Sequence, residues 1–295
     1  MKNIQKITIQ DLNDLLLKAK KRLSVSNSSP QTIANYLRAV ESLCKFTGKH
    51  PRDISIDQVT DFIYDLQHNK NRAWRTIKVY TAGLRWYFTH MEENSGLAQK
   101  IPYPKEEKDL PKILSREDLK QFFSGCKNIK HRVMFQLVYS SGLRRNELLN
   151  LKIRDIQTDD GKFRIRINRS KGNKDRYTVL SQKLLPQLRE YYLIYRPKEY
   201  LFNGRIKGEP MSAEGLRHAM IKAVKQSGFK KDINLHILRH CFASHALEEG
   251  LNIRTLQELL GHSSIQTTMI YLHVSNIPLY KAFSPFDKWR KNHGK

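Results

Sequence analysis

A break in the helical periodicity constrains the fold of this chain more than any other feature. Apolar residues recur at helical spacing on both sides of it, but between Ser95 and Leu114 the chain reads SGLAQKIPYPKEEKDLPKIL, with three prolines and charges of both signs. Such a stretch does not continue a helix and has little apolar surface to bury. The sequence therefore predicts a domain at residues 1–105, a linker at residues 106–114, a second domain at residues 115–275 and a tail at residues 276–295.

Four amphipathic helical patterns fill the first domain. The second is the best delimited, because Ser29 is a suitable N-cap, Pro30 follows at the first helical position and Gly48 stands where the helix should end. The fourth pattern, at about residues 75–91, combines an apolar side with a basic stripe. The basic residues of this stripe are Arg75, Lys78 and Arg85. Such a stripe is typical of a solvated helix face or of a surface that positions a polyanion.

The second domain is predicted to be mostly helical with one strand-rich interruption. Residues 162–169 alternate between apolar and polar side chains after a DDG turn, and SKGNKD then turns into a second strand at residues 177–180. Helical patterns follow at residues 184–195, 212–226, 236–249 and 253–260. The expected fold class is mainly α, with a small antiparallel β-sheet in the second domain.

The charge of the chain predicts a polyanionic partner. The net charge is +25, and residues 1–105 hold 17 basic and 9 acidic side chains, so both predicted domains are basic. Nucleic acid, an anionic membrane surface and ribosomal RNA would all satisfy this excess. Two basic domains on either side of a joint could close around a rod-like polyanion such as a DNA duplex.

Other features predict a cytoplasmic protein. Its longest apolar runs are interrupted by charge, so we expect no membrane span, and the N-terminus lacks the apolar stretch of a secretory signal. The three cysteines Cys44, Cys126 and Cys241 are far apart and show no metal or redox spacing. They are expected to be reduced thiols, mostly packed in the cores.

Three segments contain chemically unusual residues. In YSSGLRRNELLNL, Gly142 can end one helix and Arg144 falls near the start of the next, where a guanidinium beside free backbone N–H groups would bind a phosphate. The alternative is an ordinary surface arginine. In LHILRHCFASHALEEG, His236, Arg239 and His240 project from one helix face.

Two alternative interpretations apply to His236 and His240, the histidine pair of the second segment. Its spacing is also a zinc pattern, but the metalloprotease version needs Glu where this chain has Ile237, and the cation at Arg239 would oppose a metal. The histidines could also be core residues satisfied by hydrogen bonds.

The third segment is LQELLGHSSIQTTMIYLHV. Gly261 is placed as a helix C-cap and His262 follows it, while Ser263 or Ser264 can cap a second helix that carries Tyr271. Tyr271 alone could equally be a core residue.

Taken together, the segments resemble the tyrosine recombinase, or phage-integrase, family, in its Xer-like or mobile-element branch. The residues found in the order and approximate spacing of that family are Arg144, Lys171, His236, Arg239, His262 and Tyr271. HILRH, LQELLGHSS and TTMIY are nearly the Xer-type pattern, and GLRRNELLNL and SKGNKDRYTVL match the family's arginine and lysine segments. The resemblance covers nearly the whole chain and implies a helical DNA-clamping domain, a linker and a catalytic domain.

The resemblance implies DNA recombination through a 3′-phosphotyrosyl intermediate, for integration, excision or resolution. It implies double-stranded DNA and a homotetramer on two DNA sites as partners, and no cofactor, metal, ATP or small-molecule substrate. Because a phenol of pKa near 10 is only about 0.1% ionised at neutral pH, Tyr271 needs a proton acceptor, for which His236 is the candidate. We expect Arg144, Arg239 and His262 to stabilise the charged transition state.

Lys171 is the expected general acid for the leaving 5′ oxygen, with Lys174 as its competitor. The tail at residues 276–295 is expected to dock on a neighbouring protomer. Two other functions stay open at this point. They are relaxation of DNA by a type IB topoisomerase-like activity, and DNA binding without catalysis.

Overall fold

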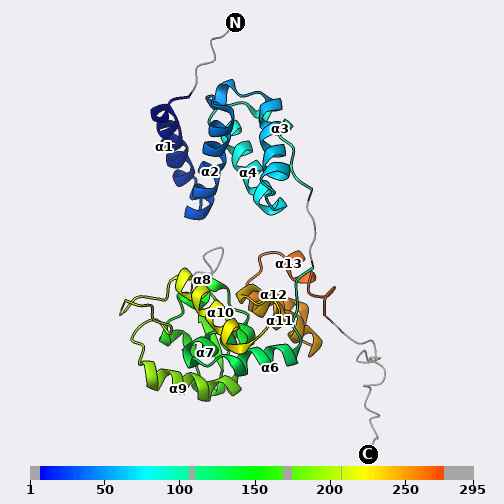
Figure 1. Ribbon diagram of the computed structural model, residues 1–295. Helices are drawn as coiled ribbons and strands as arrows, with labels where there is room; N and C mark the ends of the chain where they lie inside the picture. Colours follow the sequence, from blue (N-terminus) through cyan, green and yellow to red (C-terminus); the bar gives the residue numbers. More distant parts are fainter. Residues whose placement is uncertain (1–6, 106–109, 169–174, 207, 276–295) are drawn as a thin grey trace, which may run out of the picture. The chain divides into compact units, whose positions relative to one another are not determined.

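The computed structural model describes residues 7–105, 110–168, 175–206 and 208–275. Their contacts divide the chain into two compact units, residues 1–108 and 109–295, and Figure 1 labels most of their helices. In the described part of the chain, no helix is both long enough and apolar enough to cross a membrane. The two units are described separately below.

The first unit is a group of helices with well-defined caps. Its elements are α1 (Ile9–Val25), α2 (Pro30–Thr47), a 3-10 turn (Pro51–Asp53), α3 (Ile56–Tyr64), a π turn (Asp65–Asn69), α4 (Trp74–His90) and α5 (Ser95–Lys100). Ser29 accepts the Thr32 backbone N–H at 3.1 Å, and Gly48 ends α2 in the left-handed conformation, with φ of +68°. Both predicted caps of this helix are confirmed.

Close packing of α2 on α4 organises the core of the first unit. A Cβ atom at Gly83 of α4 would lie 3.0 Å from the Tyr36 Cα atom of α2, so a larger residue there would push the helices apart. The buried side chains around this contact include Val40, Leu43 and Leu84.

Helix α5 occupies part of the stretch in which the sequence pattern lapses. Asn94 caps it by accepting the Leu97 N–H at 3.0 Å, and Ile101 just beyond it is fully buried in the core of the first unit. Six residues are too few to show a helical period, which is why the pattern did not reveal it. Arg85 of the predicted basic stripe donates hydrogen bonds to the carbonyl of Ile101 at 2.5 and 3.2 Å.

The second unit surrounds α7 with helices and one small sheet. Its helices are α6 (Arg116–Gly125), α7 (Ile129–Ser141), α8 (Arg145–Leu149), α9 (Leu185–Tyr195), α10 (Ala213–Ser227), α11 (Leu235–Glu248), α12 (Ile253–Leu260) and α13 (Gln266–Met269). The helices predicted near α9 to α12 are confirmed. The strands are β1 (Ile156–Gln157), β2 (Arg164–Ile167) and β3 (Arg176–Val179), with 3-10 turns at Ile153–Asp155, Asp159–Gly161 and Gln182–Leu184.

The three strands form an antiparallel sheet in the order β1-β2-β3. Ile165 pairs with Thr178, and Ile165 and Ile167 point into the core, as the alternation of residues 162–169 predicted. Strand β1 was not predicted, because two residues cannot display an alternating pattern. The fold class, mainly α with a small antiparallel sheet in the second unit, is confirmed.

Aromatic rings and buried thiols fill the core of the second unit. The Phe122 ring lies 5.8 Å from Phe135 and 5.9 Å from Phe229, between centroids. Leu114, which the sequence assigned to the linker, is buried in this core, and its backbone N–H donates to Cys241 Sγ at 3.2 Å. All three cysteines are buried and free, as predicted.

The Phe122 cluster gives a test of this core. Replacing the fully buried Phe122 with Ala should lower the free energy of unfolding of the second unit by about 3–5 kcal/mol, because the cavity removes ring contacts that the neighbours cannot replace. Calorimetry of the full chain measures the shift. Tyr192→Ala is the control, since that aromatic side chain of α9 is 44% exposed and should cost about 1 kcal/mol or less. Equal shifts for the two variants would contradict the assignment.

Candidate active site

Arg144 is held at the start of α8 by an acidic side chain. Gly142 ends α7 with φ of +65°, which reverses the chain and makes Arg144 the N-cap of α8. The Glu147 carboxylate accepts the Arg144 backbone N–H at 2.7 Å and Arg144 Nη1 at 2.9 Å. The sequence predicted a phosphate site made by this guanidinium beside free backbone N–H groups. The Arg144 N–H is bonded to Glu147 and is not free, so of these two Arg144 groups only the guanidinium can donate to an anion.

Arg239 is a buried cation held by backbone carbonyls. Its side chain on α11 is only 5% exposed, and its guanidinium donates to the carbonyl of Gly142 and, at 2.8 Å, to that of Leu260. Burial, followed by the charge of Arg144, lowers the pKa of Arg239 to about 10. The group therefore stays protonated at neutral pH, and its positive charge is fixed in place.

The C-terminal end of α12 brings the two arginines together. Arg144 Nη2 donates to the Gly261 carbonyl at 2.6 Å, one residue beyond the Leu260 carbonyl that binds Arg239. Gly261 is the predicted C-cap, with φ of +63°. A Cβ atom there would lie 2.3 Å from Arg176 Nε and 3.3 Å from Arg144 Nη1. Glycine is required both for the backbone conformation and for the space that the arginines occupy.

His262 joins the same network in a defined protonation state. Its Nε2 atom lies 3.1 Å from Arg239 Nη2, and its Nδ1 atom lies 2.9 Å from Oγ1 of the buried Thr268. Because a guanidinium only donates, Nε2 accepts and the ring proton resides on Nδ1. Burial, followed by the neighbouring arginines, lowers the pKa of His262 to about 4. In this state His262 orients Arg239, and donation to a phosphate would require its Nε2 atom to be protonated.

Tyr271 is buried against α11 through a hydrogen bond to His240. Its hydroxyl lies 2.8 Å from His240 Nδ1, and the side chain is 2% exposed. Burial raises the pKa of Tyr271, whereas the charges of Arg239 and Arg144 lower it. Burial, His236 and Arg239 lower the pKa of His240 to about 4, so its ring is neutral and can accept the phenolic hydrogen.

The predicted helix that carries Tyr271 is shorter than expected. Helix α13 ends at Met269, and Tyr271 lies in the turn that follows, with its N–H donated to the Thr268 carbonyl at 3.0 Å. Ser264 Oγ accepts the Gln266 N–H at 3.3 Å near the start of α13. The turn continues to Ser275, whose hydroxyl bonds the Tyr271 carbonyl at 2.7 Å.

His236 lies one helical turn before His240 and is exposed at the start of α11. Partial desolvation, followed by the charges of Arg239 and Arg145, lowers the pKa of His236. The tyrosine hydroxyl bonds His240 in this structure, although the sequence assigned proton acceptance to His236.

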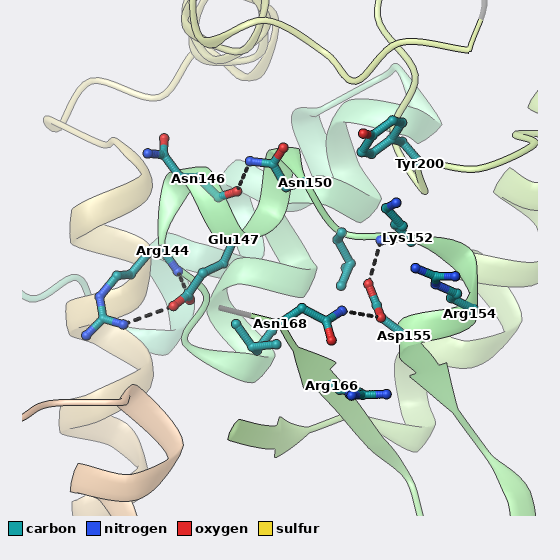
Figure 2. A pocket seen from close by; sticks show the side chains of 12 residues that line it. Arg144, Asn146, Glu147, Asn150, Lys152, Arg154, Asp155, Arg166, Asn168 and Tyr200 are labelled. Carbon is teal, nitrogen blue, oxygen red and sulfur yellow. Dashed lines mark hydrogen bonds and ion pairs between the residues drawn. The ribbon is translucent and has the colours of Figure 1, made fainter. Parts of the chain in front are cut away.

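A pocket of about 890 Å³ opens beside this network. Figure 2 shows Arg144 and Glu147 on one side of it and Lys152, Arg154 and Tyr200 on the other. The buried Asp155 connects two other lining residues of the pocket, since it accepts hydrogen bonds from the Lys152 backbone N–H at 2.9 Å and from Asn168 Nδ2 at 2.7 Å. More cationic than acidic side chains line the pocket, so it is suited to an anionic ligand.

The structure thus brings Arg144, Arg239 and His262 into one network with Tyr271 beside it. Lys171, its competitor Lys174 and the tail at residues 276–295 lie outside the described residues. Three residues to which sequence reasoning gave no role in the chemistry also belong to the network, namely Glu147, Arg176 and His240, although His240 was placed on the helix face of His236 and Arg239. Glu147 could have been predicted from the sequence, because it stands three residues after a helix start, where a capping box places an acid.

The donor set of the network fits an anion. Among the residues that the structure describes, no group of three or more His, Cys, Asp or Glu side chains could hold a metal ion. Glu147 faces three arginines, with Arg144 and Arg176 bonded to it and Arg239 Nη1 at 3.9 Å from it. The surplus positive charge and the forked donors match the oxygens of a phosphate.

The chain matches two family profiles. Residues 108–276 match the one described as the phage integrase family, and residues 15–95 match the phage integrase N-terminal SAM-like domain. A putative integrase/recombinase of Sinorhizobium fredii is 36% identical over 266 residues, covering 90% of this chain and 86% of that protein. The tyrosine recombinase XerC of Staphylococcus epidermidis is 31% identical over 232 residues, covering 75% and 77%.

Solved structures share the fold at lower identity. The XerH site-specific recombinase in a post-cleavage complex with its difH substrate has a TM-score of 0.72 at 21% identity, covering 97% of this chain and 92% of that one. A lambda integrase tetramer bound to a Holliday junction has a TM-score of 0.73 at 17% identity, covering 92% and 78%. At these identities the likeness establishes the fold alone.

The hydrogen bonds of the two site histidines predict their tautomers. At pH 7, ¹⁵N-resolved NMR should find His262 with its proton on Nδ1 and His240 with its proton on Nε2, and both should stay neutral until the pH approaches about 4. Because the unfolded rings bind protons near pH 6.5, these two groups should make folding less stable as the pH falls from 6.5 to 4. Protonation of either ring near pH 6.5 in the folded protein would contradict the geometry.

Proposed function

This chain belongs to the phage integrase family of tyrosine recombinases, and from that premise we propose that it cuts and rejoins DNA at the Arg144–Arg239 site with Tyr271 as nucleophile. The convergence of Arg144 and Arg239 on the end of α12 is the observation that supports this proposal most. Two fixed guanidiniums can bind the nonbridging oxygens of one phosphate as negative charge develops there. Positioned arginines are worth roughly 10³ to 10⁵ in rate in other phosphoryl transfers.

The reaction conserves the energy of the DNA linkage. The Tyr271 oxygen attacks the scissile phosphorus, a P–O bond forms, and the bond from phosphorus to the 5′ oxygen breaks. The phenolic proton passes to a histidine, and the leaving 5′ oxygen receives a proton from Lys171. A 5′ hydroxyl from another strand can then attack the phosphotyrosine and reverse each of these transfers. Strand exchange is therefore the outcome.

The hydrogen bond at 2.8 Å favours His240 as the group that receives the phenolic proton. His236, exposed one turn earlier on the same helix face, is then left to contact the phosphate. A side chain that is 2% exposed cannot reach a DNA phosphate, so the turn at residues 270–275 must move before attack. The structure corresponds to a resting state in this proposal.

The proposed partners follow from the family and the charge. The ligand is double-stranded DNA, bound by both basic units, with residues 1–105 as the clamp and residues 115–275 as the catalytic domain. The difH complex of XerH and the Holliday-junction tetramer of lambda integrase suggest a homotetramer on two DNA sites. The tail at residues 276–295 would dock on a neighbouring protomer, and the reaction would take place in the cytoplasm.

A nicked suicide substrate tests the proposed chemistry. Wild type should form a protein–DNA adduct that resists SDS, and Tyr271→Phe should form none, because the ring remains but the attacking oxygen is gone. Arg239→Lys should lower adduct formation by about 10²-fold or more, since a point charge replaces the fork.

Three outcomes would count against this function. Absence of an adduct from both wild type and Tyr271→Phe would leave DNA binding without catalysis. An adduct of equal yield from the two would assign the nucleophile to another residue. Plasmid relaxation without strand exchange would favour the topoisomerase-like activity. Tyr64→Phe, a change to an exposed tyrosine of α3, is the matched control and should form the adduct at the wild-type rate.

Two arginines of the basic stripe of α4 are expected to have different roles, one in binding a DNA phosphate and the other in stabilising the first unit. Arg75→Ala should flatten the slope of log affinity against log salt by about one unit, because one phosphate contact is lost. Arg85→Ala should instead destabilise the first unit by about 1 kcal/mol, because Arg85 donates to the Ile101 carbonyl. DNA titrations at several salt concentrations and thermal unfolding measure the two effects. A salt slope that changes for Arg85 and not for Arg75 would reverse the assignment.

A further inference from the structure

Arg176 is a third arginine of the site, and the transition-state chemistry described above does not use it. It is the first residue of β3, and its side chain is 10% exposed. Its Nη2 atom donates to Glu147 Oε2 at 2.8 Å. The Cδ and Nε atoms of Arg176 lie within 2.6 Å of where a Cβ atom of Gly261 would stand, so the side chain lies directly against the end of α12.

Core packing alone does not account for a guanidinium at this position. Burial lowers the pKa of Arg176, Glu147 raises it and the charge of Arg144 lowers it, so the cation is stabilised by its acid and opposed by its neighbour. Its Nε and Nη1 atoms are buried and have no hydrogen-bond partner among the residues that the structure describes. An apolar side chain of similar length would avoid both the cost of burying a charge and the cost of leaving buried N–H donors without a partner.

The Glu147 carboxylate is the group on which Arg176 acts. Oε2 of this carboxylate already accepts two hydrogen bonds, from the Arg144 backbone and from Arg176, and it lies 3.9 Å from Arg239 Nη1. Without Arg176, the negative charge of Oε2 would attract Arg239 away from the Gly142 carbonyl. The carboxylate would then compete with a phosphate for both remaining arginines.

We propose that Arg176 is a positioning residue for DNA cleavage: it occupies the Glu147 carboxylate, so that Arg144 and Arg239 keep their charge directed at the scissile phosphate. The inference rests on the proposed recombinase function and extends it to a residue that contacts neither the nucleophile nor the leaving group. Three arginines and one acid leave the cluster with a surplus of two positive charges. Removal of Arg176 would halve that surplus.

The test measures the rate of adduct formation in a single turnover, with the protein in excess over a nicked suicide substrate. Wild type is measured first, and absence of its adduct would contradict the proposed function rather than the role of Arg176. Given a wild-type adduct, Arg176→Met should be slower by about 10²-fold, comparable to the loss of a positioned donor at other oxyanion sites. Arg176→Lys should fall between the two, because it keeps the charge and loses the fork.

A second substitution distinguishes positioning from folding. Glu147→Gln in the Arg176→Met background removes the competing charge, and this double variant should be faster than Arg176→Met alone by about 10-fold, within the coupling that neighbouring groups show. Loss of packing would not be repaired by a change at Glu147. Arg217→Met is the matched control, since it removes one arginine from an exposed ion pair with Glu214 on α10 and should retain the wild-type rate.

A substrate with sulfur at the bridging 5′ position locates the step that Arg176 supports. Sulfur leaves without a general acid, so this substrate should restore a variant that is defective in protonating the leaving group. We expect no restoration for Arg176→Met, because its defect is in the charge at the phosphate. Wild-type cleavage by Arg176→Met, a double variant no faster than Arg176→Met, or restoration by the sulfur substrate would each overturn the proposal.

Discussion

The rest of the site depends on the hydrogen bonds and ion pairs that the Glu147 carboxylate makes. Arg144 and Arg176 donate to it at 2.9 and 2.8 Å, and Arg239 lies 3.9 Å away. Three like charges at such spacing would repel strongly in a partly buried site, so the acid offsets them while all three arginines are present. It also accepts the Arg144 N–H that begins α8. A single side chain thus defines both a helix start and the charge balance of the site.

Backbone carbonyls at helix ends supply the remaining constraint. Gly142 and Gly261 each end a helix in the left-handed conformation, and the carbonyls of Gly142, Leu260 and Gly261 accept hydrogen bonds from Arg144 and Arg239. The last carbonyls of a helix lack partners within it and carry partial negative charge. The arginines satisfy these groups without a second acid. The cluster therefore keeps its surplus positive charge when it is buried.

Sequence reasoning found the parts of this site that local chemistry marks. Gly261 was identified as a C-cap because glycine after an amphipathic run is a local signal, and Arg239 because it shares a helix face with His236. Arg176 gave no such signal, since its role depends on a contact with Glu147, 29 residues away. His240 was placed on the same helix face as His236 and Arg239, but its contact with Tyr271, 31 residues away, could not be predicted from that face. Helix α13 and strand β1 were misjudged or missed because each is too short to show a period.

The turn that carries Tyr271 and the arginine cluster differ in local stability, and this difference affects how the proposed cleavage is controlled. The arginine cluster is fixed by the long helix α11 and by the end of α12, whereas Tyr271 lies in a turn that begins after the four residues of α13. Short segments open at lower free energy than the long elements on which they pack, and the turn is such a segment although the Tyr271 side chain itself is buried. In the proposed reaction, the arginine cluster can therefore stay formed while Tyr271 is released. With Tyr271 as the proposed nucleophile, cleavage would require a local rearrangement of residues 270–275, and DNA bound to the preformed arginines would be uncut until that turn opens.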